Sequence, residues 1–152
     1  MVDPMSRFSD RKVFTAHADP YSFRIMYDTE FDPNNFGCCT PEKVKQSTYI
    51  WVMENRIEYN QPFSGCCGAY ADRISVIYFD DPIVEKAVPR PAGWCRKTCC
   101  KATDSILLQD RCCFGCCVWR QIRLQGMKDS TALAEAINQQ RSRALTSVGM
   151  KV

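Results

Sequence analysis

The sequence predicts an α+β domain in which antiparallel β-strands are followed by one amphipathic helix near the C-terminus. Two observations support this class. Runs rich in β-branched and aromatic residues, bounded by Pro, Gly, Asn and Asp, recur between residues 48 and 125. Residues 131–145 instead repeat apolar side chains at helical spacing. With 152 residues, 45% of them hydrophobic and 24% charged, the chain is long enough for one folded domain and too short for two comfortable ones.

The chain is expected to consist of an extended N-terminal arm at 1–40, a folded domain at 41–146 and a short tail at 147–152. Pro and Asn residues interrupt the apolar stretches of the arm, and residues 21–27 are its one expected strand. The arm is also rich in aromatic residues, which is unusual for a loose tail. We therefore expect it to pack either on its own domain or on a partner.

Three strands are expected in the first half of the domain, at 48–53, 55–60 and 73–79. The first two are close enough to form a hairpin through Glu54-Asn55. In the third, alternation places Ile74, Val76 and Tyr78 on one face. The Asp-Asp-Pro sequence at 80–82 ends this strand.

Residues 82–104 are predicted to connect the two halves, because Pro89 and Pro91 leave room only for a short helix at 83–87. Strands at 105–110 and 118–125 then flank a hairpin tip, and Gly126 is expected to end the second of them. The final helix has an apolar stripe that includes Leu133 and Ile137. Either Asp129 or Ser130 is expected to be its N-cap.

The order of these elements resembles that of the pleckstrin-homology-like (PH-like) superfold. The residues that carry the resemblance are "TYIWVMENRIEYN" at 48–60, "DRISVIYF" at 72–79 and "VWRQIRLQGMKDSTALAEAI" at 118–137, within a region of about 41–146. The resemblance implies a bent antiparallel sheet or barrel whose open corner is closed by the apolar stripe of the C-terminal helix.

The same resemblance implies a docking function. PH-like domains bind phosphoinositide headgroups through basic residues in the first hairpin loop, or they bind peptides and protein surfaces. Here the corresponding loop has the sequence Glu54-Asn55-Arg56, with one basic residue and one acid, which departs from the lipid-binding pattern. Fold analogy alone does not select the partner.

The chain contains 11 cysteines, and four of them lie in "RCCFGCCVW" at 111–119. Residues 1–14 have no apolar core of a signal peptide, and no stretch approaches the ~18 apolar residues of a spanning helix. This predicts a cytoplasmic protein in a reducing compartment, where a disulfide scaffold is not expected.

One interpretation of the cysteines is a structural zinc site. Cys113 and Cys116 have the C-x₂-C spacing that allows two thiolates to bind one zinc ion. Cys95 and Cys99, or Cys100, are the expected further ligands, and the pairs at 38–39 and 66–67 are reserves. If 112–117 instead forms a tight hairpin, Cys112 faces Cys117 and Cys113 faces Cys116, and the two pairs project to opposite faces of the sheet.

Three other interpretations remain open. Thiols can be small buried hydrophobic groups, with one sulfur of each doublet in the core. They can also carry acyl groups at a membrane surface, because aromatic and basic residues lie beside them. These neighbours are Trp94, Phe114, Trp119, Arg96, Lys97, Lys101 and Arg111. Disulfides are the third interpretation, although bridging opposed residues of a hairpin strains the ladder.

No pattern in the sequence indicates an enzyme. His17 is the one histidine and lies in the irregular arm, where nothing fixes it beside a nucleophile. The Asp80-Asp81 pair is more typical of a turn that ends a strand than of a catalytic pair. A redox role for Cys113 and Cys116 lacks the strand-to-helix context that lowers the pKa of a thiol.

The sequence therefore favours a non-catalytic, cysteine-rich docking or structural module, such as an accessory subunit of a larger cytoskeletal or ciliary assembly. Its expected partners are proteins, which contact the arm and the sheet surface. A net charge of +3, with basic residues spread along the chain, does not indicate nucleic-acid binding. The alternatives are a peripheral membrane module, held by S-acylated cysteine pairs or by lipid headgroup binding, and a zinc-stabilised interaction domain.

Overall fold

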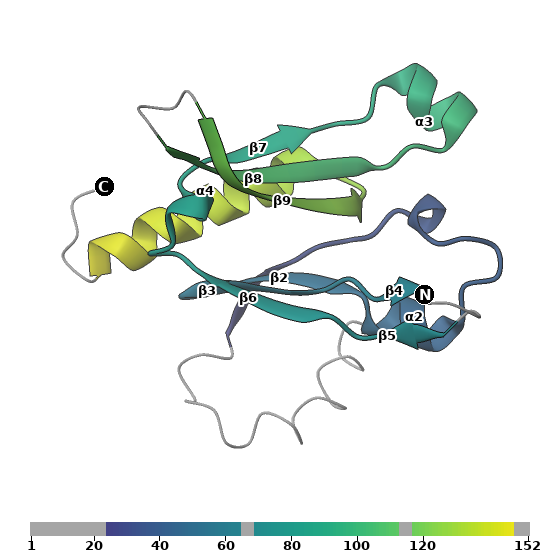
Figure 1. Ribbon diagram of the computed structural model, residues 1–152, viewed down its shortest axis with the longest axis horizontal. Helices are drawn as coiled ribbons and strands as arrows, with labels where there is room; N and C mark the ends of the chain where they lie inside the picture. Colours follow the sequence, from purple (N-terminus) through teal and green to yellow (C-terminus); the bar gives the residue numbers. More distant parts are fainter. Residues whose placement is uncertain (1–23, 65–68, 113–116, 148–152) are drawn as a thin grey trace.

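The computed structural model describes residues 24–64, 69–112 and 117–147. These residues form two antiparallel sheets, and the C-terminal helix α4 (Ser130–Ser147) contacts strands of both (Figure 1). The predicted α+β class is confirmed at this level. Within the described ranges, the two sheets do not close into the barrel that the PH-like resemblance implied.

The first sheet has the strand order β1-β2-β3-β6. Its strands are β1 (Ile25–Asp28), β2 (Tyr49–Met53), β3 (Arg56–Asn60) and β6 (Ile74–Tyr78). The strands β2, β3 and β6 confirm those expected in the first half of the domain, and β1 confirms the strand expected in the arm. A small two-stranded sheet of β4 (Phe63–Ser64) and β5 (Tyr70–Ala71) lies between β3 and β6 in the chain.

The described part of the N-terminal arm packs on its own domain. β1 pairs with β2, and η2 (Pro33–Asn35) and α2 (Glu42–Ser47) follow it. The backbone N–H of Asp32 donates to the carbonyl of Gly126 at 2.8 Å, and that of Lys128 donates to the carbonyl of Glu30 at 3.0 Å. The folded unit thus includes residues on the N-terminal side of the boundary expected at residue 41. Residues 1–23 of the arm lie outside the described residues.

The second sheet has the order β7-β8-β9. Its strands are β7 (Ala87–Arg90), β8 (Asp104–Cys112) and β9 (Cys117–Met127). β8 and β9 confirm the expected hairpin strands, but β7 lies in the region predicted to be a connection. Pro89 is compatible with β7 because this strand is at the edge of the sheet, where the missing N–H removes no necessary ladder bond.

Two short helices also differ from the prediction. The helix expected at 83–87 is only a turn of 3₁₀ helix, η4 (Pro82–Val84), since Ala87 already belongs to β7. The helix α3 (Trp94–Cys100) was not expected. Gly93 precedes it, and Lys101 ends it in a left-handed conformation with φ 50°.

The prediction that Gly126 ends a strand is wrong, because β9 continues through it to Met127. Gly126 has φ 92°, at a shift in the register between β8 and β9. A Cβ atom there would collide with the side chain of Asn35 in η2. Glycine therefore permits both the positive φ and the close approach of the segment after β1.

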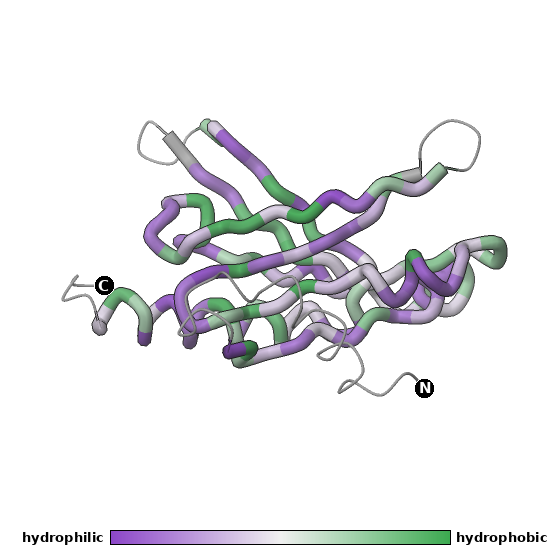
Figure 2. Tube along the Cα trace, turned by 90° about the horizontal axis from the view of Figure 1, so that it is seen from below, coloured by the Kyte–Doolittle hydropathy of each residue, from purple (hydrophilic) through white to green (hydrophobic). Residues whose placement is uncertain are grey.

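The core lies between the two sheets and is closed by α4. Hydrophobic and hydrophilic segments follow one another along the chain (Figure 2). The side chains of Leu133 and Ile137 are fully buried, in one cluster with Ile50 of β2 and Leu108 of β8. The Asp129 carboxylate accepts hydrogen bonds from the N–H groups of residues 131 and 132, at 3.0 Å each, which confirms Asp129 as the N-cap.

The substitution Ile137→Ala tests the role of α4 in the core. We expect it to lower the free energy of unfolding by about 2–5 kcal/mol, because it leaves a cavity between the two sheets. The exposed helix residue Gln139 is the matched position, and Gln139→Ala should change stability by less than about 0.5 kcal/mol. Urea unfolding followed by circular dichroism measures both variants, and equal effects would contradict the packing described here.

Candidate docking surfaces

The structure shows two of the four cysteines predicted as zinc ligands. Cys95 and Cys99 lie on α3, and both are exposed. Cys113 and Cys116 lie outside the described residues. Among the residues that are described, no group of three or more His, Cys, Asp or Glu side chains is arranged to hold a metal ion.

The fold separates α3 from the hairpin end of the second sheet. α3 leads into the first residue of β8, Asp104, whereas Cys112 at its last residue pairs with Cys117 of β9. β8 has nine residues, which span roughly 26 Å at about 3.3 Å per residue. The opposition of Cys112 and Cys117 agrees with the tight-hairpin interpretation of this segment.

The interpretation of the cysteines as buried hydrophobic groups is wrong for the side chains that the structure shows. All of these are exposed: Cys38, Cys39, Cys95, Cys99, Cys100 and Cys117. In the doublet at 38–39 the two sulfur atoms are 3.5 Å apart, and neither enters the core. Core packing therefore does not explain why these positions are cysteine.

A buried carboxylate attaches α3 to the second sheet. The Lys97 ammonium is 2.8 Å from Oδ1 of Asp104, whose side chain is only 5% exposed. The same carboxylate accepts hydrogen bonds from the N–H of Ala92 at 2.9 Å and from the N–H and hydroxyl of Ser130, each at 3.2 Å. Asp104 thus joins β8, the segment after β7, the helix α3 and the first residue of α4.

These contacts determine the charge state of the pair. Burial by itself raises the pKa of Asp104, but the hydrogen bonds from Lys97, Ala92 and Ser130 outweigh it and lower the pKa below its ordinary value. The hydrogen bond to Asp104 raises the pKa of Lys97. Both groups are therefore charged at neutral pH, and the ion pair that attaches α3 is present.

The second surface is the outer face of β6. Ile74, Val76 and Tyr78 are 58%, 43% and 54% exposed, whereas Ile77 and Phe79 point into the core. The sequence predicted that the first three share a face, and that part of the prediction is confirmed. It did not predict that this face would be open to solvent.

The backbone of the same three residues faces away from the sheet. β6 pairs with β3, and within the described ranges no strand lies on its other side. The N–H of Phe79 donates to the carbonyl of Asn55 at 3.2 Å, so these two residues form a hydrogen-bonded pair. Since such pairs alternate along an antiparallel ladder, the N–H and C=O groups of Ile74, Val76 and Tyr78 point to the open edge.

The neighbouring strand β3 contributes a polar row to this outer face. Arg56 is opposite Tyr78, Glu58 is opposite Val76, and Asn60 is opposite Ile74. The Arg56 and Glu58 side chains form an ion pair at 3.7 Å and are only 12% and 19% exposed. An apolar row along β6 thus lies between a fixed polar row and an open strand edge.

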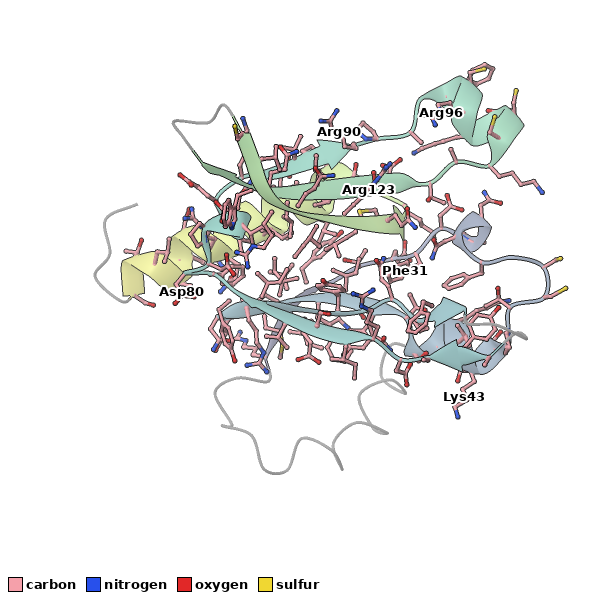
Figure 3. The ribbon with its side chains drawn as sticks, in the orientation of Figure 1. Phe31, Lys43, Asp80, Arg90, Arg96 and Arg123 are labelled. Atoms are coloured by element: carbon pink, nitrogen blue, oxygen red, sulfur yellow. The ribbon has the colours of Figure 1, made fainter. Side chains whose placement is uncertain are left out.

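The candidate catalytic residues do not form a site among the described residues. Asp81 caps η4 by accepting from the N–H of Ile83 at 3.0 Å, and its carboxylate is paired with Arg120. Asp80 is exposed at the turn that follows β6 (Figure 3). His17 lies outside the described residues. The pair at 80–81 therefore has the turn role that the sequence indicated.

None of the helices that the structure describes is long and apolar enough to cross a lipid bilayer. Comparisons of the chain with known protein families, with curated proteins and with solved structures find no match.

The variant Asp104→Asn tests the ion pair and its pH dependence. At neutral pH it should lower the free energy of unfolding by about 2–3 kcal/mol, because hydrogen bonds to a charged acceptor are lost. The folded-state pKa of Asp104 is lowered, so the stabilisation is complete above its unfolded pKa and is lost as pH falls through the folded pKa. The difference from wild type should therefore shrink between about pH 7 and about pH 3.

Urea unfolding at the two pH values measures this effect. Asp80→Asn at the exposed turn is the matched control and should have a small effect at both. If the difference in the free energy of unfolding between wild type and Asp104→Asn were the same at both pH values, the stabilising role of the charged Asp104 carboxylate would be contradicted.

Proposed function

We propose that the chain is a non-catalytic docking module that binds an extended segment of a partner protein along β6. The bound segment would extend the first sheet by one strand, as an accessory subunit does when it attaches to a larger assembly. In this mode of recognition, backbone hydrogen bonds supply affinity and alternate side chains supply specificity.

The arrangement of elements supports a PH-like architecture for this module. Four consecutive strands of the first sheet are followed by three strands of the second, apart from the small β4-β5 pair, and α4 comes last and contacts both sheets. One backbone bridge, between Phe31 and Met127, connects the segment that follows β1 to the last residue of β9. We propose that this is an open variant of the PH-like fold.

The observation that carries the docking proposal is the coincidence of two properties on one strand. Ile74, Val76 and Tyr78 have exposed apolar side chains, and their backbone groups also point to the open edge. Soluble proteins usually protect a sheet edge with charges, prolines or a covering element. β6 itself, with the sequence Ile-Ser-Val-Ile-Tyr, contains no charge and no proline.

The chemistry of the partner follows from this surface. An antiparallel segment that pairs with β6 would place every second side chain beside the apolar row, so these positions are expected to be apolar. At the two ends of β6, Arg73 and Asp80 are both exposed, with opposite charges. An acidic residue opposite Arg73 and a basic residue opposite Asp80 would set the register of the segment.

A selection experiment tests this proposal. Short random peptides displayed on phage are selected on the full chain, and one enriched peptide is then synthesised and its Kd measured. We expect the enriched sequences to alternate apolar and polar residues. Val76→Lys should weaken binding about tenfold or more, because it places a charge in the apolar row.

Val76→Pro probes the backbone contribution. It removes an N–H that points away from β3, so the ladder inside the sheet is kept, and binding should weaken several-fold. The control is Met26→Lys, which changes an exposed apolar side chain on β1 at the other edge of the sheet and should leave Kd unchanged. Urea unfolding shows that each variant is folded. Peptides that bind the folded Val76 variants as tightly as wild type would refute docking along β6.

A further inference from the structure

We propose that α3 is a membrane-facing element that is S-acylated on Cys95 and Cys99. This inference does not depend on docking along β6, because it concerns another element at another part of the surface. It rests on the orientation of α3, on the exposure of its side chains and on the charge of the segment around it.

The orientation of α3 directs the two thiols away from the domain. Cys95 and Cys99 are four residues apart and share a face of the helix. Lys97 is two residues from each, which is a rotation of about 200° about the helix axis. Because Lys97 is held by the buried carboxylate of Asp104, the Cys95–Cys99 face points outward. The sulfur atoms of α3 lie at the outer rim of the molecule (Figure 3).

The whole of α3 is accessible. Every residue from Trp94 to Cys100 is exposed, and the indole of Trp94 is 82% exposed, the largest value among the exposed hydrophobic side chains that the structure describes. Trp94 directly precedes Cys95 in the chain and lies about 60° from Lys97 around the helix axis, and its indole is still open to solvent. Tryptophan is enriched where a protein meets the interface of a bilayer, because its ring is apolar at one end and polar at the other.

The charge of this segment is complementary to an anionic membrane surface. Residues 90–101 contain Arg90, Arg96, Lys97 and Lys101 and no acidic residue. Lys97 is neutralised by Asp104, and the other three basic residues are exposed. Figure 3 shows Arg96 on α3 and Arg90 on β7, the strand that leads toward this helix. Basic residues beside acylated cysteines supply the second attraction that stable anchoring by lipid chains needs.

The modification is a thioester exchange. The Sγ atom of Cys95 or Cys99 attacks the thioester carbonyl of a long-chain acyl-coenzyme A and forms a new carbon–sulfur bond. The carbonyl bond to the sulfur of coenzyme A breaks, and coenzyme A leaves as a thiol with the proton that the cysteine gives up. No oxidation or reduction takes place, and two acyl chains give the firmer of the two anchoring modes.

Acyl exchange on the full chain tests the modification. The chain is expressed in eukaryotic cells, its free thiols are blocked, and thioesters are cleaved with hydroxylamine and labelled. We expect a hydroxylamine-dependent label on wild type that the double variant Cys95→Ser, Cys99→Ser reduces by at least half. The matched control is Cys38→Ser, Cys39→Ser, which alters two exposed cysteines outside α3 and should keep the label that depends on Cys95 and Cys99.

Vesicle sedimentation of the unmodified chain tests the membrane contact separately. It should bind vesicles that contain phosphatidylserine more tightly than vesicles of phosphatidylcholine alone. Arg96→Glu and Lys101→Glu should each weaken this binding roughly fivefold or more. Wild type without a hydroxylamine-dependent label, or a label that persists in the Cys95, Cys99 variant, would overturn the proposal. If acylation of α3 fails this test but the phage-selected peptide still binds the Val76 variants more weakly than wild type, docking along β6 stands on its own.

Discussion

The packing of α4 between two sheets is the constraint on which the rest of the structure depends. The apolar side chains that the two sheets turn toward each other form one core cluster with α4, and the sheets do not close into a barrel within the described residues. Leu133 and Ile137 fill the space between them and are fully buried with residues of both sheets. Asp104 then fixes the start of this helix through Ser130.

This core explains which surfaces remain for function. The inward side chains of both sheets are used by α4, so the apolar residues that point outward on β6 are not part of the core. The same is true of Trp94, which lies on α3 in the connection between β7 and β8. Asp104 connects the core to α3, because its carboxylate binds both Ser130, the first residue of α4, and Lys97, which orients α3. The two candidate surfaces are therefore attached to one packed body.

Much of the fold could be predicted from the sequence, because β-branched and aromatic runs, period-two patterns and an apolar stripe report local structure directly. β2, β3, β6, β8, β9 and α4 all have such patterns. β7 could not be predicted because Pro89 is a poor strand residue except at an edge, and edges are a property of the whole sheet. Gly126 was predicted to end a strand because glycine is typical of strand ends. Glycine is equally required at this bulge, where the side chain of Asn35 in η2 leaves no space for a Cβ atom.

The candidate surfaces were less predictable, since exposure depends on contacts that are distant in the chain. The sequence predicts that Ile74, Val76 and Tyr78 share one face of β6. Their exposure to solvent could not be predicted, because it depends on the position of β6 in the strand order. The salt bridge of Lys97 with Asp104 has no sequence signature, although it determines which face of α3 is turned toward the second sheet. The prediction of a zinc site with Cys95, Cys99, Cys113 and Cys116 stays a prediction.

Residue-resolved hydrogen exchange of the free full-length chain tests the central claim most directly, because it reports which backbone groups of β6 are open to solvent. The account predicts alternation along this strand. The amides of Ser75 and Ile77 should exchange slowly, since they donate to β3, while those of Ile74, Val76 and Tyr78 should exchange rapidly. Equal and strong protection of all five amides would show that the edge of β6 is already covered, and it would contradict a strand that is free to bind a partner.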